Sequence, residues 1–131
     1  MLKLLALALA AGLVLISRNV HAAPLDTYRW KARPVIVFGS GESATFREQL
    51  GLFNRASRGL RERDMVLIPV SNSGGREDLR RAYNVAPGEF EVLLVGKDGG
   101  VKLRSRELVS PEEIFRTVDA MPMRRDEMRR R

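Results

Sequence analysis

Residues of the types that carry covalent chemistry are almost absent from this chain. The sequence has no cysteine and a single histidine, His21. His21 follows an apolar leader that we expect to be removed, so the mature protein would contain neither residue type. A thiol nucleophile, a Ser–His pair and a Cys/His zinc site are thereby excluded. We therefore predict no catalytic residues, no metal site and no cofactor.

The leader has the features of a signal peptide. Lys3 precedes an unbroken run of apolar or small residues at 4–16. As a helix this run would span about 20 Å, which is shorter than the ~30 Å hydrocarbon core of a membrane. Residues 20–22, Val-His-Ala, then provide a small-x-Ala cleavage site. We predict a signal peptide at 1–22, export to the periplasm or the cell exterior, and no membrane-spanning segment after cleavage. An uncleaved N-terminal anchor is the alternative.

Two apolar runs predict the central part of a sheet. Residues 34–38 are nearly all apolar and β-branched, which is typical of a buried central strand. Residues 64–70 form a second run that contains Pro69. Because proline cannot donate to a strand ladder, this second strand is expected at a sheet edge. Residues 23–33, before the first strand, are expected to form an extended segment.

Helix and hairpin signals complete the fold. Capping boxes open two helices, and an Asp-Gly turn joins two strands. The expected elements are helices from 45 to about 60, at 77–83 and from 110 to about 121, and a hairpin of strands 90–96 and 101–107. The order β-α-β-α-β-β-α predicts an α/β, thioredoxin-like three-layer fold, with a central mixed sheet and helices on both faces. This domain is expected at 34–121, followed by a basic tail at 122–131.

Four stretches of the chain resemble one domain family. They are Arg33-Pro-Val-Ile-Val-Phe38, Glu62-Arg-Asp-Met-Val-Leu-Ile68, residues 87–100 and Asp119-Ala-Met-Pro-Met-Arg124. They resemble the uncharacterised, exported, peroxiredoxin-like domain family of the P-DUDES type, related copies of which occur in animal extracellular-matrix proteins. The resemblance covers about residues 25–125. It implies a thioredoxin-like fold and an exported location, and it brings no established reaction.

The resemblance also implies where a redox site would lie. Overlay of residues 35–38 on the first strand of thioredoxins puts Ser43 at the nucleophilic cysteine and Phe46 at the resolving one. Neither side chain can perform thiol chemistry. The proline that precedes the hairpin strand in thioredoxins is displaced as well, with Glu91 at its place and Pro87 four residues earlier. The resemblance therefore implies the fold without its redox chemistry.

The same overlay defines a candidate pocket at Ser40, Glu42, Ser43, Thr45 and Phe46. Ser43 could act as a nucleophile only with a lysine or carboxylate base. We favour the interpretation that Ser43 or Thr45 caps the helix. The helix N-terminus would also attract an anion weakly, although Glu42 opposes one.

The C-terminal segment is a candidate docking tail. The chain has a net charge of +7, and five arginines fall within its last eight residues, namely Arg124, Arg125, Arg129, Arg130 and Arg131. One interpretation is a solvated helix end, where arginine is favourable near the negative end of the helix dipole. The other is a tail that docks on an acidic protein or an anionic envelope surface. Export argues against nucleic acid as a partner.

Two classes of function remain open. The leading hypothesis is an exported, non-catalytic binding or interaction domain with a thioredoxin-like fold and no redox cysteines. The alternative is an enzyme related to peroxiredoxins or thioredoxins, with a modified, cofactor-dependent site at residues 40–46.

Overall fold

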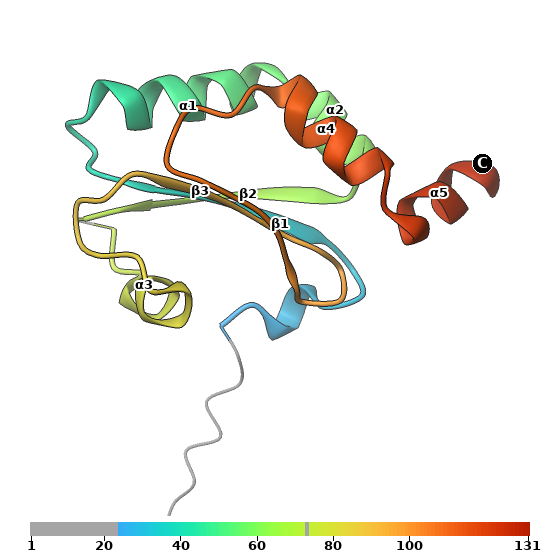
Figure 1. Ribbon diagram of the computed structural model, residues 1–131, viewed down its shortest axis with the longest axis horizontal. Helices are drawn as coiled ribbons and strands as arrows, with labels where there is room; N and C mark the ends of the chain where they lie inside the picture. Colours follow the sequence, from blue (N-terminus) through green and yellow to red (C-terminus); the bar gives the residue numbers. More distant parts are fainter. Residues whose placement is uncertain (1–23, 73) are drawn as a thin grey trace, which may run out of the picture.

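A four-stranded mixed sheet forms the middle layer of the domain (Figure 1). The computed structural model describes residues 24–72 and 74–131, so the predicted signal peptide lies outside the described residues. The strands are β1 (Arg33–Gly39), β2 (Met65–Ser71), β3 (Glu91–Val95) and β4 (Val101–Ser105), in the order β2-β1-β3-β4. This arrangement confirms the predicted thioredoxin-like α/β fold.

The first strand lies at the centre of the sheet. β1 pairs in parallel with β2 and antiparallel with β3, and all seven of its residues are buried. Among the described strands β2 pairs with β1 alone, and Pro69 lies opposite Val37. Because one side of β2 is unpaired, a residue without an N–H can occupy it without breaking the ladder. The predictions of a central first strand and an edge second strand are both confirmed.

Helices cover the two faces of the sheet unequally (Figure 1). They are α1 (Ala44–Arg55), α2 (Ser57–Glu62), α3 (Glu77–Tyr83), α4 (Pro111–Asp119) and α5 (Pro122–Arg129). α1, α2 and α4 lie over one face and α3 lies under the other. The core is divided accordingly, with Phe53 and Ile114 in one apolar cluster and Phe38 and Leu79 in the other.

The first helix confirms its predicted cap and differs in its length. Of the two predicted caps, Ser43 and Thr45, Ser43 is the N-cap, and its hydroxyl accepts the backbone N–H of Phe46 at 3.4 Å. The helix is interrupted at Ala56 and resumes as α2, so the apolar stripe that ends at Leu60 belongs to two helices. Gly51 lies within α1 and does not end it.

The segment before β1 is not extended as the sequence predicted. It contains a short 3-10 helix, η1 (Asp26–Tyr28), and a turn in which Trp30 has φ of +66°. The Trp30 N–H donates to the carbonyl of Lys97 at 2.7 Å, so the turn is held by the β3–β4 hairpin. Tyr28 packs against the apolar cluster on the α3 side of the sheet.

Candidate functional site

The predicted thioredoxin-type site lies at the carboxyl end of β1, and its residues have structural contacts. Ser40 accepts the N–H of Glu42 through its hydroxyl, and Ser43 caps α1. Glu42 and Thr45 are exposed. The two positions aligned with the redox cysteines therefore hold a helix cap, Ser43, and a core side chain, Phe46.

Phe46 fills the space in front of β1. Its side chain is 4% exposed and lies directly against Gly39. A Cβ at Gly39 would stand 2.6 Å from Cδ2 of Phe46, which is much closer than any ordinary contact. Gly39 thus lets the aromatic ring close the end of the strand.

A buried arginine fastens this same end of the sheet. Arg80 of α3 is 3% exposed. Its guanidinium donates to the carbonyls of Gly39, Val70 and Ala86 and to the side-chain oxygen of Asn72. These four acceptors are uncharged, so hydrogen bonds rather than an ion pair compensate the buried cation. The sequence pattern of α3 gave no signal for this role.

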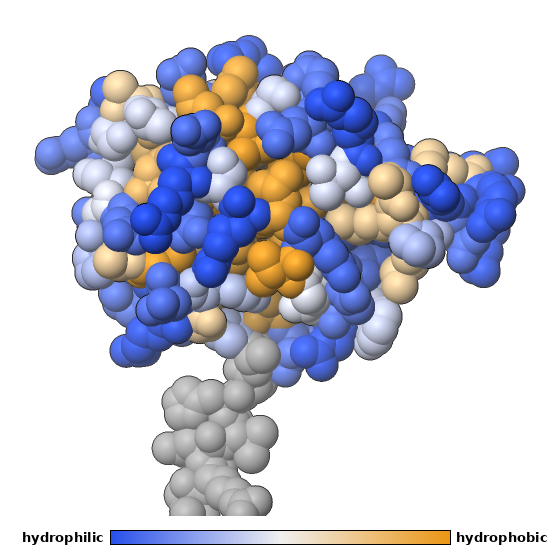
Figure 2. Space-filling model, in the orientation of Figure 1, coloured by the Kyte–Doolittle hydropathy of each residue, from blue (hydrophilic) through white to orange (hydrophobic). Residues whose placement is uncertain are grey.

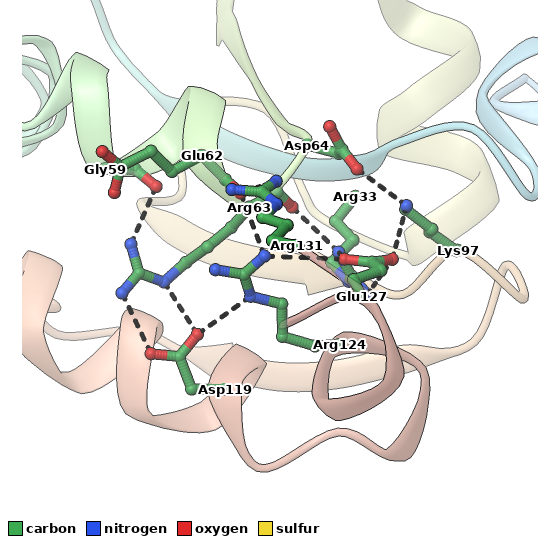
Figure 3. Close-up of polar contacts among 10 residues, drawn as sticks. All are labelled: Arg33, Gly59, Glu62, Arg63, Asp64, Lys97, Asp119, Arg124, Glu127 and Arg131. Carbon is green, nitrogen blue, oxygen red and sulfur yellow. Dashed lines mark hydrogen bonds and ion pairs between the residues drawn. The ribbon is translucent and has the colours of Figure 1, made fainter. Parts of the chain in front are cut away.

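Within the part of the chain that the structure describes, the largest group of interacting charges lies at the opposite end of the sheet, where β1 and β2 begin (Figure 3). We call it the Arg33 cluster. Its members are Arg33, Arg63, Asp64, Lys97, Asp119, Arg124 and Glu127. They come from β1, the α2–β2 turn, the β3–β4 hairpin and the two C-terminal helices.

Glu127 is one centre of the cluster. It accepts hydrogen bonds from both Nη atoms of Arg33, at 3.1 and 3.0 Å, and from Nζ of Lys97 at 2.6 Å. Lys97 also contacts Asp64 at 2.9 Å. Burial alone would raise the pKa of Glu127, but the hydrogen bonds from Arg33 and Lys97 outweigh it and lower the pKa to about 2.

Asp119 is the second centre. Its carboxylate accepts hydrogen bonds from Nε and Nη2 of Arg63, at 3.0 and 2.9 Å, and from Nε of Arg124 at 3.2 Å. Burial acts to raise the pKa of Asp119, whereas the hydrogen bonds from the two arginines lower it, and the net effect is a lowered pKa. Arg124 is 5% exposed and also donates to the carbonyl of Glu62 at 3.0 Å.

The four stretches that carry the family resemblance meet in this cluster. Arg33 begins the first stretch, the second contains Arg63 and Asp64, the third contains Lys97, and the fourth runs from Asp119 to Arg124. Sequence reasoning did not bring these residues together, although charged residues in or beside each stretch were the available signal. Four cations face three carboxylates in the cluster, which leaves one positive charge in excess.

An open groove of about 520 Å³ lies beside the cluster. Cationic residues of its lining are Arg33, Lys97 and Lys102, and its apolar wall includes Met121, Pro122 and Met123. We call it the Arg33 groove. Figure 2 shows apolar surface where the chain passes from α4 to α5, surrounded by hydrophilic side chains.

The predicted docking tail is largely the helix α5, and its arginines are not equivalent. Arg124 is buried in the Arg33 cluster, so its assignment to a docking surface is wrong. Arg129 pairs with Asp126, and Arg131 donates to the carbonyl of Glu62 at 3.0 Å. Arg125 and Arg130 are exposed. The tail therefore combines a structural arginine with exposed ones.

The described residues contain neither a metal-type cluster nor a spanning helix. Within 24–72 and 74–131, His, Cys, Asp and Glu residues do not gather in threes at a distance that would hold a metal ion. In the same ranges, the helices lack the length and apolar character needed to cross a membrane.

The sheet order, with a central strand paired in parallel to an edge strand and antiparallel to a hairpin, defines a thioredoxin-like protein. Solved structures agree. Plasmodium yoelii thioredoxin peroxidase I superimposes with a TM-score of 0.63 and 16% identity, over 78% of this chain and 79% of that one. The thioredoxin domain of a Bacteroides vulgatus thiol-disulfide oxidoreductase gives a TM-score of 0.52 and 12% identity, over 69% and 79%. At such identities the likeness concerns the fold alone.

The chain belongs to the family described as Domain of unknown function (DUF4174), which matches residues 24–127. It is also 28% identical over 135 aligned positions to the human sushi repeat-containing protein SRPX. The alignment covers 91% of this chain and 29% of that protein. The chain thus spans less than a third of the length of this curated relative.

Proposed function

We propose that this protein is an exported, non-catalytic binding domain that uses the thioredoxin-like fold as a scaffold. The proposal rests on which residues occupy the two positions aligned with the redox cysteines of thioredoxins. Ser43 caps α1 and Phe46 belongs to the core, in a chain without cysteine. Thiol–disulfide exchange and the thiol-based reduction of peroxides both require a thiolate, which neither serine nor phenylalanine provides.

Export is supported by the leader. The apolar run at 4–16 and the Val-His-Ala sequence at 20–22 match what signal peptidases read. Cleavage there would make Ala23 the first residue of the mature protein. Mass measurement of the exported form checks this point, and a membrane-bound form that retains residues 4–16 would contradict it.

We place the recognition surface at the Arg33 groove and the adjoining exposed face of α5. The groove combines an apolar wall with Lys97 and Lys102, and Arg125 and Arg130 add exposed positive charge nearby in sequence. Such a surface favours a negatively charged partner, and charges of this kind act over about 8 Å at physiological salt. An acidic protein is the partner that we favour over an anionic envelope surface.

The proposal is tested by two measurements on the mature protein. It should neither reduce insulin nor consume hydrogen peroxide above a heat-inactivated control, with a thioredoxin and a peroxiredoxin as positive controls. Native mass spectrometry of protein purified from its own cellular compartment should reveal a bound ligand or partner that high salt removes. Robust turnover would overturn the proposal in favour of the cofactor-dependent enzyme.

A further inference from the structure

A second open pocket, of about 490 Å³, lies beside α3. We call it the α3 pocket. It is lined by α3, by the connection from α3 to β3 and by the segment that follows β4, and it shares no lining residue with the Arg33 groove. Its volume is typical of sites for small molecules. The charged residues of its lining are the cations Arg80, Arg81 and Arg106 and the carboxylates Glu77 and Glu89.

None of these three cations forms an ion pair within the ranges that the structure describes. The ion pairs at neighbouring positions involve Arg76 and Arg104 instead. Glu77 and Glu89 line the pocket as well, but neither carboxylate lies at ion-pair distance from its guanidinium groups. Three cations and two carboxylates leave one positive charge in excess. The positive charge of the α3 pocket is therefore not neutralised by any direct contact.

Arg80 contributes a buried charge that has no counter-ion. Its side chain is 3% exposed, and its hydrogen-bond acceptors are three backbone carbonyls and the amide oxygen of Asn72. These uncharged acceptors satisfy N–H groups of the guanidinium but do not neutralise its charge. Buried charges in proteins are ordinarily paired with an opposite charge. Because water screens a buried charge weakly, the field of Arg80 attracts an anion that enters the adjoining pocket.

Arg81 and Arg106 supply the donors that such an anion would contact. Both are exposed, and neither side chain donates a hydrogen bond to another described residue. A guanidinium presents pairs of N–H groups in a planar fork that matches the oxygens of a phosphate or a carboxylate. The two oxygens of a carboxylate fill one fork, whereas a phosphoryl group has three acceptor oxygens and can serve two arginines at once. Two arginines from different segments of the chain therefore favour a phosphoryl group.

We propose that the α3 pocket binds a phosphoryl group, either as free phosphate or as part of a small phosphate ester. Arg81 and Arg106 contact its oxygens, and Arg80 adds an unpaired positive charge behind them. The pocket has room for the organic part of an ester as well as for the phosphoryl group itself. This inference goes beyond the proposed function, because the α3 pocket is separate from the recognition surface at the Arg33 groove.

Inorganic phosphate and glycerol 3-phosphate, titrated separately into the mature protein at constant ionic strength, test the inference by backbone amide NMR. We expect saturable binding, with shifted amides at residues 80–89 and 104–107. Arg81→Gln and Arg106→Gln should each weaken binding about tenfold, as expected for the loss of charge-assisted hydrogen bonds. Arg47→Gln, at an exposed position of α1 outside the pocket, is the matched control and should bind as wild type does.

Two further variants make the test specific to this pocket. Glu89→Gln should strengthen binding about threefold, because it removes a like charge from the lining. Phosphate should also raise the thermal unfolding midpoint of the wild type, since a ligand that binds the folded state stabilises it. The double variant Arg81→Gln/Arg106→Gln should lose this increase while it remains folded, because both positions are exposed.

The two ligands distinguish the source of the phosphoryl group. Tighter binding of glycerol 3-phosphate assigns the pocket to an ester, and any other order assigns it to free phosphate. Acetate should bind at least tenfold more weakly than either. The inference is overturned if neither phosphate compound binds, if Arg81→Gln and Arg106→Gln leave the affinity unchanged, or if acetate binds equally well. These results leave the turnover assays and the search for an acidic partner unaffected, so the proposed function fails only on its own tests.

Discussion

Glu127 accepts hydrogen bonds from both Nη atoms of Arg33, at 3.1 and 3.0 Å, although 94 residues separate the two in sequence. This pair joins α5, the last helix, to the first residue of the central strand β1. Arg124 is the buried residue of α5, so ion pairs contribute more than apolar packing to the position of this helix.

The Arg33–Glu127 pair predicts a loss of stability in acid. The pKa of Glu127 is about 2 in the folded protein, below its ordinary value of 4.5. Its contribution to stability is therefore complete above pH 4.5 and is lost as the pH falls toward 2. Allowing for partial solvent exposure, we expect the free energy of unfolding to fall by about 2 kcal/mol over this range through Glu127.

Urea unfolding at a series of pH values, on wild type and Glu127→Gln, measures this effect. The variant should be less stable at pH 6, and its stability should depend less on pH between 4.5 and 2. Glu48→Gln, at an exposed position of α1, is the matched control and should retain the wild-type slope. Equal slopes for Glu127→Gln and wild type would contradict the role of the pair.

The hydrogen bonds of Gln49 predict a second loss of stability on substitution, one that does not depend on pH. This α1 side chain is fully buried and forms two hydrogen bonds with the backbone of Val109, one at 2.8 Å as donor and one at 2.7 Å as acceptor. Gln49→Leu would leave both backbone groups of Val109 buried without partners. We expect a loss of about 2–4 kcal/mol in the free energy of unfolding. Arg47→Leu, two residues away in α1 and exposed, should change stability by less than about 0.5 kcal/mol in the same denaturation assay.

The fold could be predicted because its signals are local. The β-branched run of β1, the proline of β2 and the Asp-Gly turn of the hairpin each depend on a few adjacent residues. The cap of α4 is equally local, and Ser110 does accept the N–H of Glu113 at 3.1 Å. At α1 two hydroxyl residues lie close together, and the backbone path after β1 selects Ser43 over Thr45.

The Arg33 cluster could not be assembled in the same way, because its partners are distant in sequence. Lys97 lies 33 residues from Asp64, and Arg63 lies 56 residues from Asp119. In the sequence each of these looks like an ordinary surface charge. In the sequence Arg124 looks like the four other arginines of the C-terminal segment. It differs from them in the folded protein because it donates hydrogen bonds to Asp119 and to the carbonyl of Glu62.

Two adjacent arginines of α3, Arg80 and Arg81, allow a test of how much one buried side chain stabilises the carboxyl ends of β1 and β2. Arg80 is buried and hydrogen-bonded to the carbonyls of Gly39 and Val70, whereas Arg81 is exposed. Arg80→Met would leave these acceptors buried and unpaired, and we expect a loss of about 3 kcal/mol in unfolding free energy. Arg81→Met should be nearly neutral. Similar losses for both variants would show that the helix propensity of α3, and not the hydrogen bonds of Arg80, determines the change in stability.

The arginines of α5 provide the corresponding test at the other end of the sheet. Arg124 is 5% exposed and joins Asp119 to the Glu62 carbonyl, whereas its neighbour Arg125 points to no partner among the described residues and is exposed. Arg124→Ala would leave Asp119 with Arg63 alone. We expect a loss of about 2–3 kcal/mol in unfolding free energy, since partly buried charged hydrogen bonds are broken.

Arg125→Ala is the matched variant and should leave unfolding unchanged within about 0.5 kcal/mol. The same two proteins, compared at low salt on an acidic resin, separate structure from docking. Removal of Arg125 should reduce retention while the fold stays intact, because an exposed arginine contributes charge to the surface and little to the core. If Arg124→Ala is as stable as wild type, Arg124 does not anchor α5, and the contacts of Glu127 with Arg33 and Lys97 alone hold this helix.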